Sequence, residues 1–230
     1  PAEKINITHD TKKVFSIVAT KMIEEYPKFE ENEFVKVMHA PSALLTKFQG
    51  KPMNVDAVVI LPKEYYENPI QKFPVLFSVS GYGGNYHRYS GKTPPSPKLE
   101  TVPVIMVYLD GNCALGHSVY ANSDNNGPWG DALVTEFIPQ LEKTYRCNGA
   151  RLLTGHSSGG WTVMWLQTQY PTDFIACWSS APDPVDFRNF TNVNLYEDKN
   201  MFYDKDNSQR LVATVAGFFP WATMKTTYQM

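Results

Sequence analysis

Residues 155–160 read Gly-His-Ser-Ser-Gly-Gly, and this stretch decides the fold. It contains the spacing Gly-x-Ser-x-Gly, in which a serine occupies a sharp turn between a strand and a helix. Glycines two positions before and after the serine remove side chains that would collide with the neighbouring strand and helix. The spacing therefore predicts that Ser157 is a nucleophile held at such a turn.

The sequence on either side of the serine supports this interpretation. Ala150 to Thr154 is typical of a short buried strand, whereas the apolar residues of Trp161 to Tyr170 recur near helical spacing. Ser157 then lies close to the amino end of a helix, where free backbone N–H groups and the helix dipole favour an oxyanion. The alternative is a Gly/Ser turn without chemistry, and the strand and helix on its two sides argue against it.

Strands and helices alternate along the rest of the chain. This alternation predicts an α/β fold, a three-layer sandwich with a mainly parallel central sheet and helices on both faces. Residues 1–230 are expected to form a single domain. The expected strands are 34–38, 55–61, 73–79, 102–109, 150–154 and 174–180. Three helices are expected: one after Asp10, one at 131–145 with a kink at Pro139, and one at 161–170. Residues 211–217 fit a strand or a helix equally, and 92–98 form a proline-rich loop.

Composition excludes several classes of protein. The chain is 43% hydrophobic, has a net charge of −2 and contains no cluster of Lys and Arg, so nucleic-acid binding is not expected. No segment approaches the roughly 18 uninterrupted apolar residues that a membrane-spanning helix needs. The sequence begins with Pro1, so we expect an amino-terminal piece to have been removed or left out. We expect a soluble protein and leave its compartment open, although we favour a secreted or periplasmic location over a cytoplasmic one. The oligomeric state also stays open.

Cysteine and histidine spacing gives no metal or cofactor site. Of the three cysteines, Cys113 and Cys147 could pair, although nothing requires it, and Cys177 lies in an apolar run and is expected in the core. There is no Cys-x-x-Cys, no His-x-x-x-His and no glycine-rich phosphate loop followed by Lys and Ser or Thr. We therefore expect neither a metal nor a cofactor.

A second glycine-rich stretch follows the strand expected at 73–79. Residues 80–85 read Ser-Gly-Tyr-Gly-Gly-Asn, which permits a tight turn with free backbone amides. In serine acyl-transfer enzymes one oxyanion donor is the N–H just after the nucleophile, and the other comes from this loop. We expect the backbone amides of Ser158 and Tyr82 to be these donors. A plain glycine-rich connection is the alternative.

Several stretches carry a resemblance to one family. They are Phe73 to Leu76, Gly81 to Asn85, Tyr108 to Gly111, Tyr120 to Ser123 and Gly155 to Trp161. Together they resemble the putative-esterase family of α/β-hydrolases, the group with feruloyl esterases, enterochelin-esterase-like enzymes, S-formylglutathione hydrolases and mycolyl transferases. The similarity spans about residues 54 to 190. It implies a serine nucleophile, a distant acid and a carboxyl-terminal histidine, which attack a small-molecule carboxylic ester through an acyl-enzyme.

The carboxyl end departs from the family pattern. All five histidines, His9, His39, His87, His117 and His156, precede the serine, whereas the family takes its base histidine from a later position. We therefore expect the carboxyl-terminal strands of the sheet, with the base, to be missing from the given chain. His156 is a poor base because its side chain points to another side of the turn. His87 and His117 lie in loops that could face the site, although a solvated loop position is the plainer expectation.

Aspartates after the strand at 174–180 are the candidate acids. Asp183 is our first choice and Asp186 the second, because some hydrolases take the acid from this loop. The alternative is turn chemistry, since Asp beside Pro commonly initiates turns. Trp129 and Trp161, together with Tyr82, are expected near the mouth of the site, where they suit an aromatic or sugar-linked acyl group. Core packing is the commoner role of such residues.

Two functions of different class follow from these features. The first is a serine esterase that cleaves carboxylic esters through an acyl-enzyme on Ser157, with a backbone oxyanion hole. The second is an inactive hydrolase-fold protein that binds an ester or glycan-like ligand. An acyltransferase and a serine peptidase are variants of the first. Access to the pocket decides whether water or another acceptor receives the acyl group. We favour the esterase, because a strained serine turn and a tight glycine loop are costly features for a binding surface.

Overall fold

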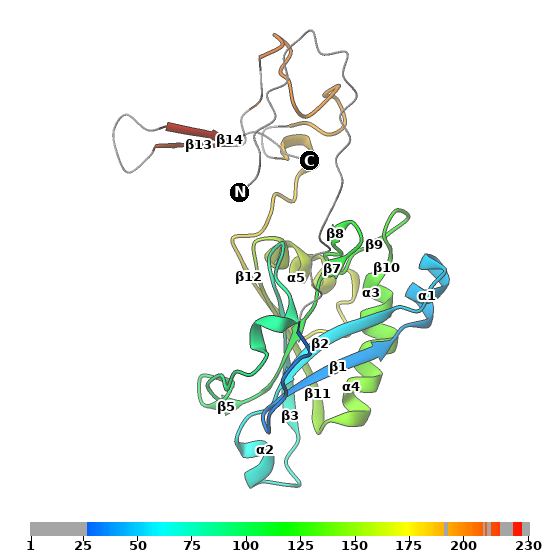
Figure 1. Ribbon diagram of the computed structural model, residues 1–230, viewed down its shortest axis with the longest axis vertical. Helices are drawn as coiled ribbons and strands as arrows, with labels where there is room; N and C mark the ends of the chain where they lie inside the picture. Colours follow the sequence, from blue (N-terminus) through cyan, green and yellow to red (C-terminus); the bar gives the residue numbers. More distant parts are fainter. Residues whose placement is uncertain (1–26, 191–192, 209, 211–212, 217–222, 227–230) are drawn as a thin grey trace.

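The computed structural model describes residues 27–190, 193–208, 210, 213–216 and 223–226. Its centre is a six-stranded sheet in the order β1-β2-β6-β3-β11-β12 (Figure 1). The strands of this sheet are β1 (Val35–Pro41), β2 (Asn54–Ile60), β3 (Phe73–Val79), β6 (Ile105–Leu109), β11 (Cys147–His156) and β12 (Ala176–Ser180). The strands expected from the sequence are thus present, with shifted ends except for β3.

The central sheet is mainly parallel, as predicted. β6, β3, β11 and β12 run in one direction, whereas β2 pairs antiparallel with β6, and β1 antiparallel with β2. Val79 at the end of β3 lies opposite Leu109 of β6 and Gly155 of β11. The loops that follow these strands therefore leave the sheet at one edge, where ligands of open α/β sheets bind.

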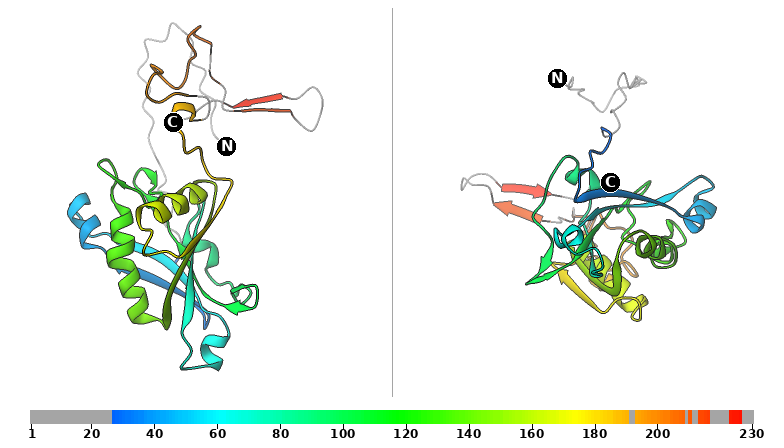
Figure 2. Two further views of the ribbon diagram at one scale, coloured as in Figure 1. Left: turned by 180° about the vertical axis from the view of Figure 1, so that it is seen from behind. Right: turned by 90° about the horizontal axis from the view of Figure 1, so that it is seen from below.

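One face of the sheet is covered by helices. Val75, Phe77 and Val79 of β3 are at most 2% exposed, and they share a core cluster with Val163 and Leu166 of α5 (Ser158–Gln169). Apolar residues of α4 (Ile138–Thr144) belong to the same cluster. The left view of Figure 2 shows the molecule from behind, with this helical layer in front of the sheet. The alternation of buried side chains along β3 is what a strand with one face on the core requires.

Pro139 is accommodated by a wide helical turn. The helix expected at 131–145 consists of α3 (Trp129–Asp131), a π-helical segment (Ala132–Phe137) and α4. At the end of the π segment, the N–H of Ile138 donates to the carbonyl of Leu133, five residues earlier. Pro139 then stands in the first turn of α4, where its missing N–H costs little. In place of a simple kink, the structure has a π segment directly before the proline.

The second face carries a thinner layer. Tyr89 of the 3-10 helix η1 (Tyr86–Tyr89) packs edge-on against Tyr108 of β6, with ring centroids 5.0 Å apart. The hairpin of β4 (Lys98–Leu99) and β5 (Val102–Pro103) also lies on this face. The strand expected at 102–109 is therefore split, because Val102 and Pro103 pair with β4 and only β6 joins the central sheet.

The expectation that Cys177 lies in the core is wrong. β12 is the outermost strand on its side, so it has one neighbouring strand within the described part of the chain. Cys177 is exposed, Trp178 is 75% exposed, and both line an open apolar cavity of about 310 Å³ with Leu76 and Leu152. Sequence hydrophobicity reports that a segment prefers burial, but it does not report what covers it. All three cysteines are free thiols, so Cys113 and Cys147 are not paired.

A short helix connects the first two strands. α1 (Ala43–Gln49) starts at Ser42, whose side chain accepts from the N–H of Leu45, and ends at Gly50 in the left-handed region with φ of 68°. The Glu136 carboxylate accepts from the N–H groups of Ala43 and Leu44. This capping charge comes from a helix more than 90 residues away in sequence, so local pattern alone did not reveal it.

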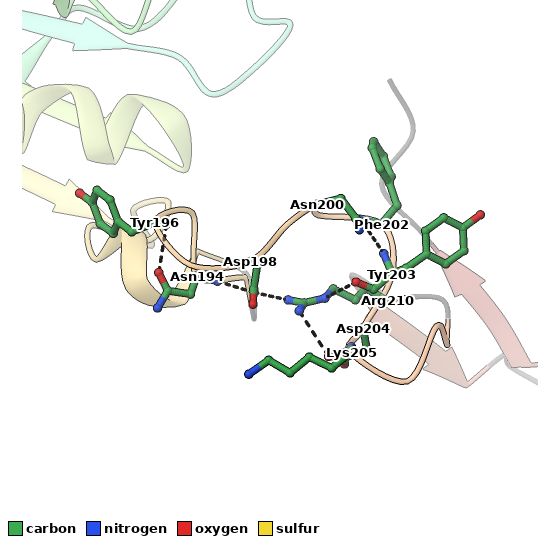
Figure 3. Close-up of polar contacts among 9 residues, drawn as sticks. All are labelled: Asn194, Tyr196, Asp198, Asn200, Phe202, Tyr203, Asp204, Lys205 and Arg210. Atoms are coloured by element: carbon green, nitrogen blue, oxygen red, sulfur yellow. Dashed lines mark hydrogen bonds and ion pairs between the residues drawn. The ribbon is translucent and has the colours of Figure 1, made fainter.

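Arg210 forms ion pairs with two aspartates of the polar segment after β12 that is drawn in Figure 3, from Asn194 to Arg210. Its guanidinium lies 2.8 Å from Asp198 and 3.3 Å from Asp204, and the side chains of Arg210 and Asp198 are only 10% and 13% exposed. Asp198 also accepts from the N–H of Asn194 at 2.9 Å. This backbone hydrogen bond and the arginine hold the pKa of the Asp198 carboxyl below its usual value. Arg210 therefore ties the segment around Asp198 to the turn at Asp204.

The remaining elements are short. They are α2 (Glu64–Glu67), β7 (Asn112–Cys113), β8 (Gly116–His117), β9 (Asn122–Ser123), β10 (Gly127–Pro128), η3 (Phe187–Asn189), β13 (Ala213–Ala216) and β14 (Thr223–Thr226). Of the two structures that fit residues 211–217, a strand or a helix, the described part forms a strand, β13. The helix expected after Asp10 lies outside the described residues. In the described ranges, no helix has the length and apolar character to cross a membrane.

Candidate active site

Ser157 stands at the turn between β11 and α5. Its φ of 57° and ψ of −126° are unusual for a residue with a side chain, and no other described non-glycine residue at positive φ adjoins a helix start in this way. Such backbone strain persists only where the surrounding structure enforces it, and it clusters at functional sites. The N–H of Ser157 is bonded to the carbonyl of Ser180 at 3.1 Å, which ties the turn to the end of β12. The predicted serine turn is therefore present.

The glycines of the turn are required by close backbone contacts. A Cβ on Gly159 would overlap the carbonyl oxygen of Val79 and would lie 2.7 Å from that of Ser80. A Cβ on Gly155 would overlap the carbonyl of Gly159 itself. These neighbours are backbone atoms, which cannot rotate away as a side chain does. The helix after the serine can thus approach β3 and the end of β11 only because Gly159 and Gly155 carry no side chain.

The glycine-rich loop after β3 lies against the serine. A Cβ on Gly81 would come within 3.2 Å of the Ser157 Cβ and 3.6 Å of its Oγ. The loop turns back at once, because the N–H of Gly84 donates to the carbonyl of Gly81 at 3.1 Å, and the Ser80 hydroxyl donates to the carbonyl of Gly84 at 3.2 Å. Tyr82, the next residue after Gly81, is 76% exposed. The sequence-predicted loop and Ser157 are therefore neighbours.

Asp183 joins the site from the loop after β12. Its Oδ2 accepts from the Ser158 hydroxyl at 2.7 Å, and its Oδ1 lies 3.4 Å from the Ser157 Oγ as the acceptor of a long hydrogen bond. Ala181, two residues earlier, has φ of 40°, so the chain bends sharply to bring the carboxylate to the serines. Asp186, the second candidate, is exposed and accepts from the N–H of Arg188 at the start of η3. Of the two aspartates, only Asp183 contacts Ser157.

The contacts of Asp183 differ from those expected of a triad acid. A triad acid holds a histidine, whereas the Asp183 carboxylate holds the side chains of two consecutive serines. The sequence pattern predicts a role for the backbone N–H of Ser158 but gives no signal for its hydroxyl, which donates to Asp183. Ser158 is 8% exposed, so this buried hydroxyl needs an acceptor, and Asp183 supplies it.

Three histidines of the described chain make contacts away from Ser157. His156 lies 3.2 Å from the Ser180 Oγ, which agrees with its side chain pointing to another side of the turn. His39 pairs with Asp56 at 2.8 Å, and His87 stacks on Tyr86 with ring centroids 4.4 Å apart. Nowhere in the described residues do three or more His, Cys, Asp or Glu side chains gather as metal ligands would.

His117 lies close enough to Asp183 for the charge of that carboxylate to affect its pKa. Its Nδ1 accepts from the N–H of Val119 at 2.9 Å, so the neutral ring carries its proton on Nε2. The ring lies against Gly111, where a Cβ would overlap Nε2. Burial lowers the pKa of His117, and this outweighs the opposing effects of the Asp183 charge and of the nearby Ser80 backbone. A loop histidine is thus packed beside the loop that follows β3, close enough to sense Asp183.

The lowered pKa of His117 gives a pH dependence of stability. Between the folded pKa and the ordinary value of 6.5, the unfolded chain binds more protons, so stability rises with pH through this window and is lost as pH falls. An asparagine side chain at this position can accept from the N–H of Val119 in the same way but cannot titrate. We expect His117→Asn to show a smaller loss of melting temperature between pH 7 and pH 5 than the wild type. His156→Asn, at an exposed histidine, is the control, and an unchanged acid loss in His117→Asn would contradict this account.

The two tryptophans predicted at the mouth lie in different environments. Trp129 is 3% exposed, and its Nε1 donates to the carbonyl of Asn126 at 2.9 Å, so this side chain belongs to the core. Its expected substrate role finds no support in this placement, because the ring is covered. Trp161, one helical turn after the serine, is partly exposed and lines an open cavity of about 240 Å³ with Val185 and Phe187. Trp161 remains a candidate contact.

Comparisons with known proteins agree with this geometry. A family model described as putative esterase matches residues 50–216. None of the curated proteins compared with the chain is significantly similar to it in sequence. Among solved structures, an S-formylglutathione hydrolase from Agrobacterium tumefaciens matches with 18% identity and a TM-score of 0.53, over 70% of this chain and 62% of its own.

Two further solved structures are similar. FphF of Staphylococcus aureus, a fluorophosphonate-binding serine hydrolase, has 14% identity and a TM-score of 0.50, over 71% of this chain and 62% of its own. A ferulic acid esterase from Anaeromyces mucronatus has 17% identity and a TM-score of 0.47, over 71% and 63%. The chain therefore spans about three fifths of the length of these structures. At such identities the likeness to the first two is one of fold.

Proposed function

The chain belongs to the putative esterase family, and from this premise we propose that it hydrolyses carboxylic esters through an acyl-enzyme on Ser157. The observation that carries the proposal is the strained backbone of Ser157, with φ of 57°, between β11 and α5. Its Oγ would attack the carbonyl carbon of the ester, the alcohol would leave, and water would then release the acid. The substrate is a small-molecule ester, and no cofactor takes part.

The oxyanion formed in this reaction would be bound by backbone amides. We assign the N–H of Ser158, which follows the nucleophile, and the N–H of Tyr82, which follows Gly81 beside the serine. Donors of this kind are fixed before reaction, so they stabilise the developing charge without reorganisation, and loss of one typically costs about 3 to 4 kcal/mol. The contact between Gly81 and Ser157 supports this assignment, because it brings the loop close to the reacting oxygen.

We propose that the Asp183 carboxylate positions Ser157 and Ser158 by accepting hydrogen bonds from their hydroxyl groups. A carboxylate is too weak a base to remove the proton of a serine alone, so a histidine is needed as general base. Within the described part of the chain, no histidine is hydrogen-bonded to Ser157. We propose that the base comes from outside the described residues. A hydrolase-fold protein that binds an ester without cleaving it is the second candidate, and this lack of a bonded histidine is the observation that favours it.

Removal of Asp183 is expected to weaken both stability and activity. Asp183→Ala leaves the buried hydroxyl of Ser158 without its acceptor, a loss of about 1 to 3 kcal/mol in the free energy of unfolding. Ester hydrolysis should fall as well, because the serine turn loses its tie to the loop after β12. Chemical denaturation and p-nitrophenyl acetate hydrolysis measure the two effects. Asp186→Ala, three residues away and exposed, is the matched control and should change both far less; equal effects of the two substitutions would contradict the assignment.

The proposed function is tested by comparing two forms of the protein. The 230-residue chain and the complete product of its gene are each assayed for p-nitrophenyl acetate hydrolysis and for an acyl group trapped on Ser157 by mass spectrometry. Hydrolysis with an acyl-Ser157 in either form supports a serine esterase, and activity only in the complete product places the base outside the given sequence. If neither form hydrolyses esters or acylates, the second candidate holds. Transfer of the acyl group to an added alcohol would identify an acyltransferase.

A further inference from the structure

A hairpin packs against the loop that we assign to the oxyanion hole. The hairpin consists of β7 and β8, which pair through Asn112 with His117 and Cys113 with Gly116. A Cβ on Gly116 would lie 2.9 Å from the Oη and 3.0 Å from the Cε2 of Tyr82. The hydroxyl end of the Tyr82 ring therefore rests on the Gly116 backbone, where φ is 100°. Only glycine adopts this conformation readily, and only glycine leaves room for the ring.

The hairpin is a firm support for that ring. Tyr120, which follows it, is fully buried, and its hydroxyl donates to the carbonyl of Asp110. The N–H of Ser118 donates to the carbonyl of Gly111 at 2.7 Å. These two hydrogen bonds tie the chain after the hairpin to the chain before it, at the end of β6. The position of Gly116 under Tyr82 is thus fixed by the core.

The rest of the Tyr82 ring is open to solvent. Tyr82 is 76% exposed although its hydroxyl end is supported, and Leu115, next to Gly116, is 67% exposed. The residue before Tyr82 is Gly81, which lies within contact distance of the Ser157 side chain. An exposed aromatic ring, held at one end and with an apolar residue beside its support, therefore belongs to the residue that directly follows the glycine against the nucleophile. Rings of this kind bind planar aromatic groups by stacking or edge contact.

We propose that the Tyr82 ring, seated on Gly116, is the binding platform for an aromatic group of the ester substrate. This inference rests on the proposed function, and it adds a substrate class to it. The aromatic group belongs to the acid or to the alcohol part of the ester, and both parts are joined at the carbonyl that Ser157 attacks. Gly116 determines specificity indirectly, because its lack of a side chain sets the position of the ring.

Three esters test the platform. Methyl 3-phenylpropanoate has an aromatic acid part, benzyl acetate has an aromatic alcohol part, and methyl acetate has neither. The quantity measured is kcat/KM for each aromatic ester divided by kcat/KM for methyl acetate, with the full-length protein. Wild type should favour at least one aromatic ester, and that ester identifies the part that lies on Tyr82.

Side-chain variants then show whether Tyr82 causes the preference. Tyr82→Ala removes the ring but keeps the backbone N–H, and we expect the ratio to fall about five- to tenfold. Tyr82→Phe keeps the ring and should keep the ratio. Gly116→Ala pushes the ring away and should lower the ratio as Tyr82→Ala does. Gly149→Ala is the matched control, because Gly149 also has a positive φ, 87°, but a Cβ there meets nothing within 4 Å.

The outcomes separate this inference from the proposed function. If wild type hydrolyses neither p-nitrophenyl acetate nor any of the three esters, the proposed function fails and the platform with it. Hydrolysis of p-nitrophenyl acetate without that of either aromatic ester overturns the platform alone. If wild type hydrolyses methyl acetate but shows no aromatic preference, or if the ratio survives in both Tyr82→Ala and Gly116→Ala, the platform alone is overturned. A fall in the ratio that Gly149→Ala reproduces would also overturn it, because the effect would then be a general one of strain.

Discussion

Ser157→Ala is expected to lower ester hydrolysis by about a million-fold relative to the active protein. The substitution removes the Oγ that attacks the ester, whereas the backbone amides of the proposed oxyanion hole stay in place. A residual rate above that of water is therefore expected, since these amides and substrate binding act without the nucleophile. The measurement is kcat/KM for p-nitrophenyl acetate with the full-length protein.

The fold should survive this substitution. The alanine retains the Cβ and the backbone, and the N–H that is bonded to Ser180 is unchanged. The melting temperature should therefore stay close to that of the wild type. Ser123→Ala, at an exposed serine of β9, is the control for activity and should hydrolyse the ester normally. Hydrolysis by Ser157→Ala at the wild-type rate would show that another group performs the reaction.

Gly159→Ala is expected to have the largest effect on stability. The new Cβ would overlap the carbonyl oxygen of Val79 and lie 2.7 Å from that of Ser80, so α5 and the end of β3 must separate. Overpacking against backbone costs about 3 kcal/mol or more when the neighbours cannot move aside. Ser80 leads into the loop proposed as the oxyanion hole, so activity should fall together with stability. Urea denaturation measures the loss of free energy of unfolding.

A control glycine separates overlap from backbone strain. Gly149 has a φ of 87°, so Gly149→Ala introduces strain, but a Cβ there has no atom within 4 Å. If overlap with β3 is the cause, Gly159→Ala destabilises more than Gly149→Ala even though only Gly149 has a positive φ. The opposite order would show that the contact of α5 with β3 is looser than the structure indicates.

Local sequence pattern predicted the parts of the fold that depend on local chemistry. β3 runs from Phe73 to Val79 as expected, because apolar residues and flanking turn residues define a buried strand. A helix after Ser157 was also expected, at 161–170, and α5 begins three residues earlier, at Ser158. In contrast, α1 was missed, since it is seven residues long and its capping carboxylate, Glu136, comes from another helix. Cys177 was misplaced, since its exposure depends on the position of β12 at the edge of the sheet.

The candidate site could be predicted only in part for the same reason. The serine and its glycines are adjacent in sequence, so their spacing indicates a turn. The hydrogen bonds of Asp183 to Ser157 and Ser158 depend on a sharp bend at Ala181, whose φ of 40° no residue type signals. Burial of Trp129 depends on the helix that it begins, and contact between Tyr82 and Gly116 joins two loops. Such contacts arise from the strand order, which brings distant segments to one edge.

Mapping a fluorophosphonate label on the full-length protein tests the central claim most directly. Such a probe reacts with a serine only where the serine is activated and an oxyanion site receives the charged oxygen. The account predicts one labelled peptide, modified at Ser157, with the label abolished by Ser157→Ala and retained by Ser123→Ala. A full-length protein that takes up no label, or that is labelled at another serine, would contradict the assignment of Ser157 as the nucleophile.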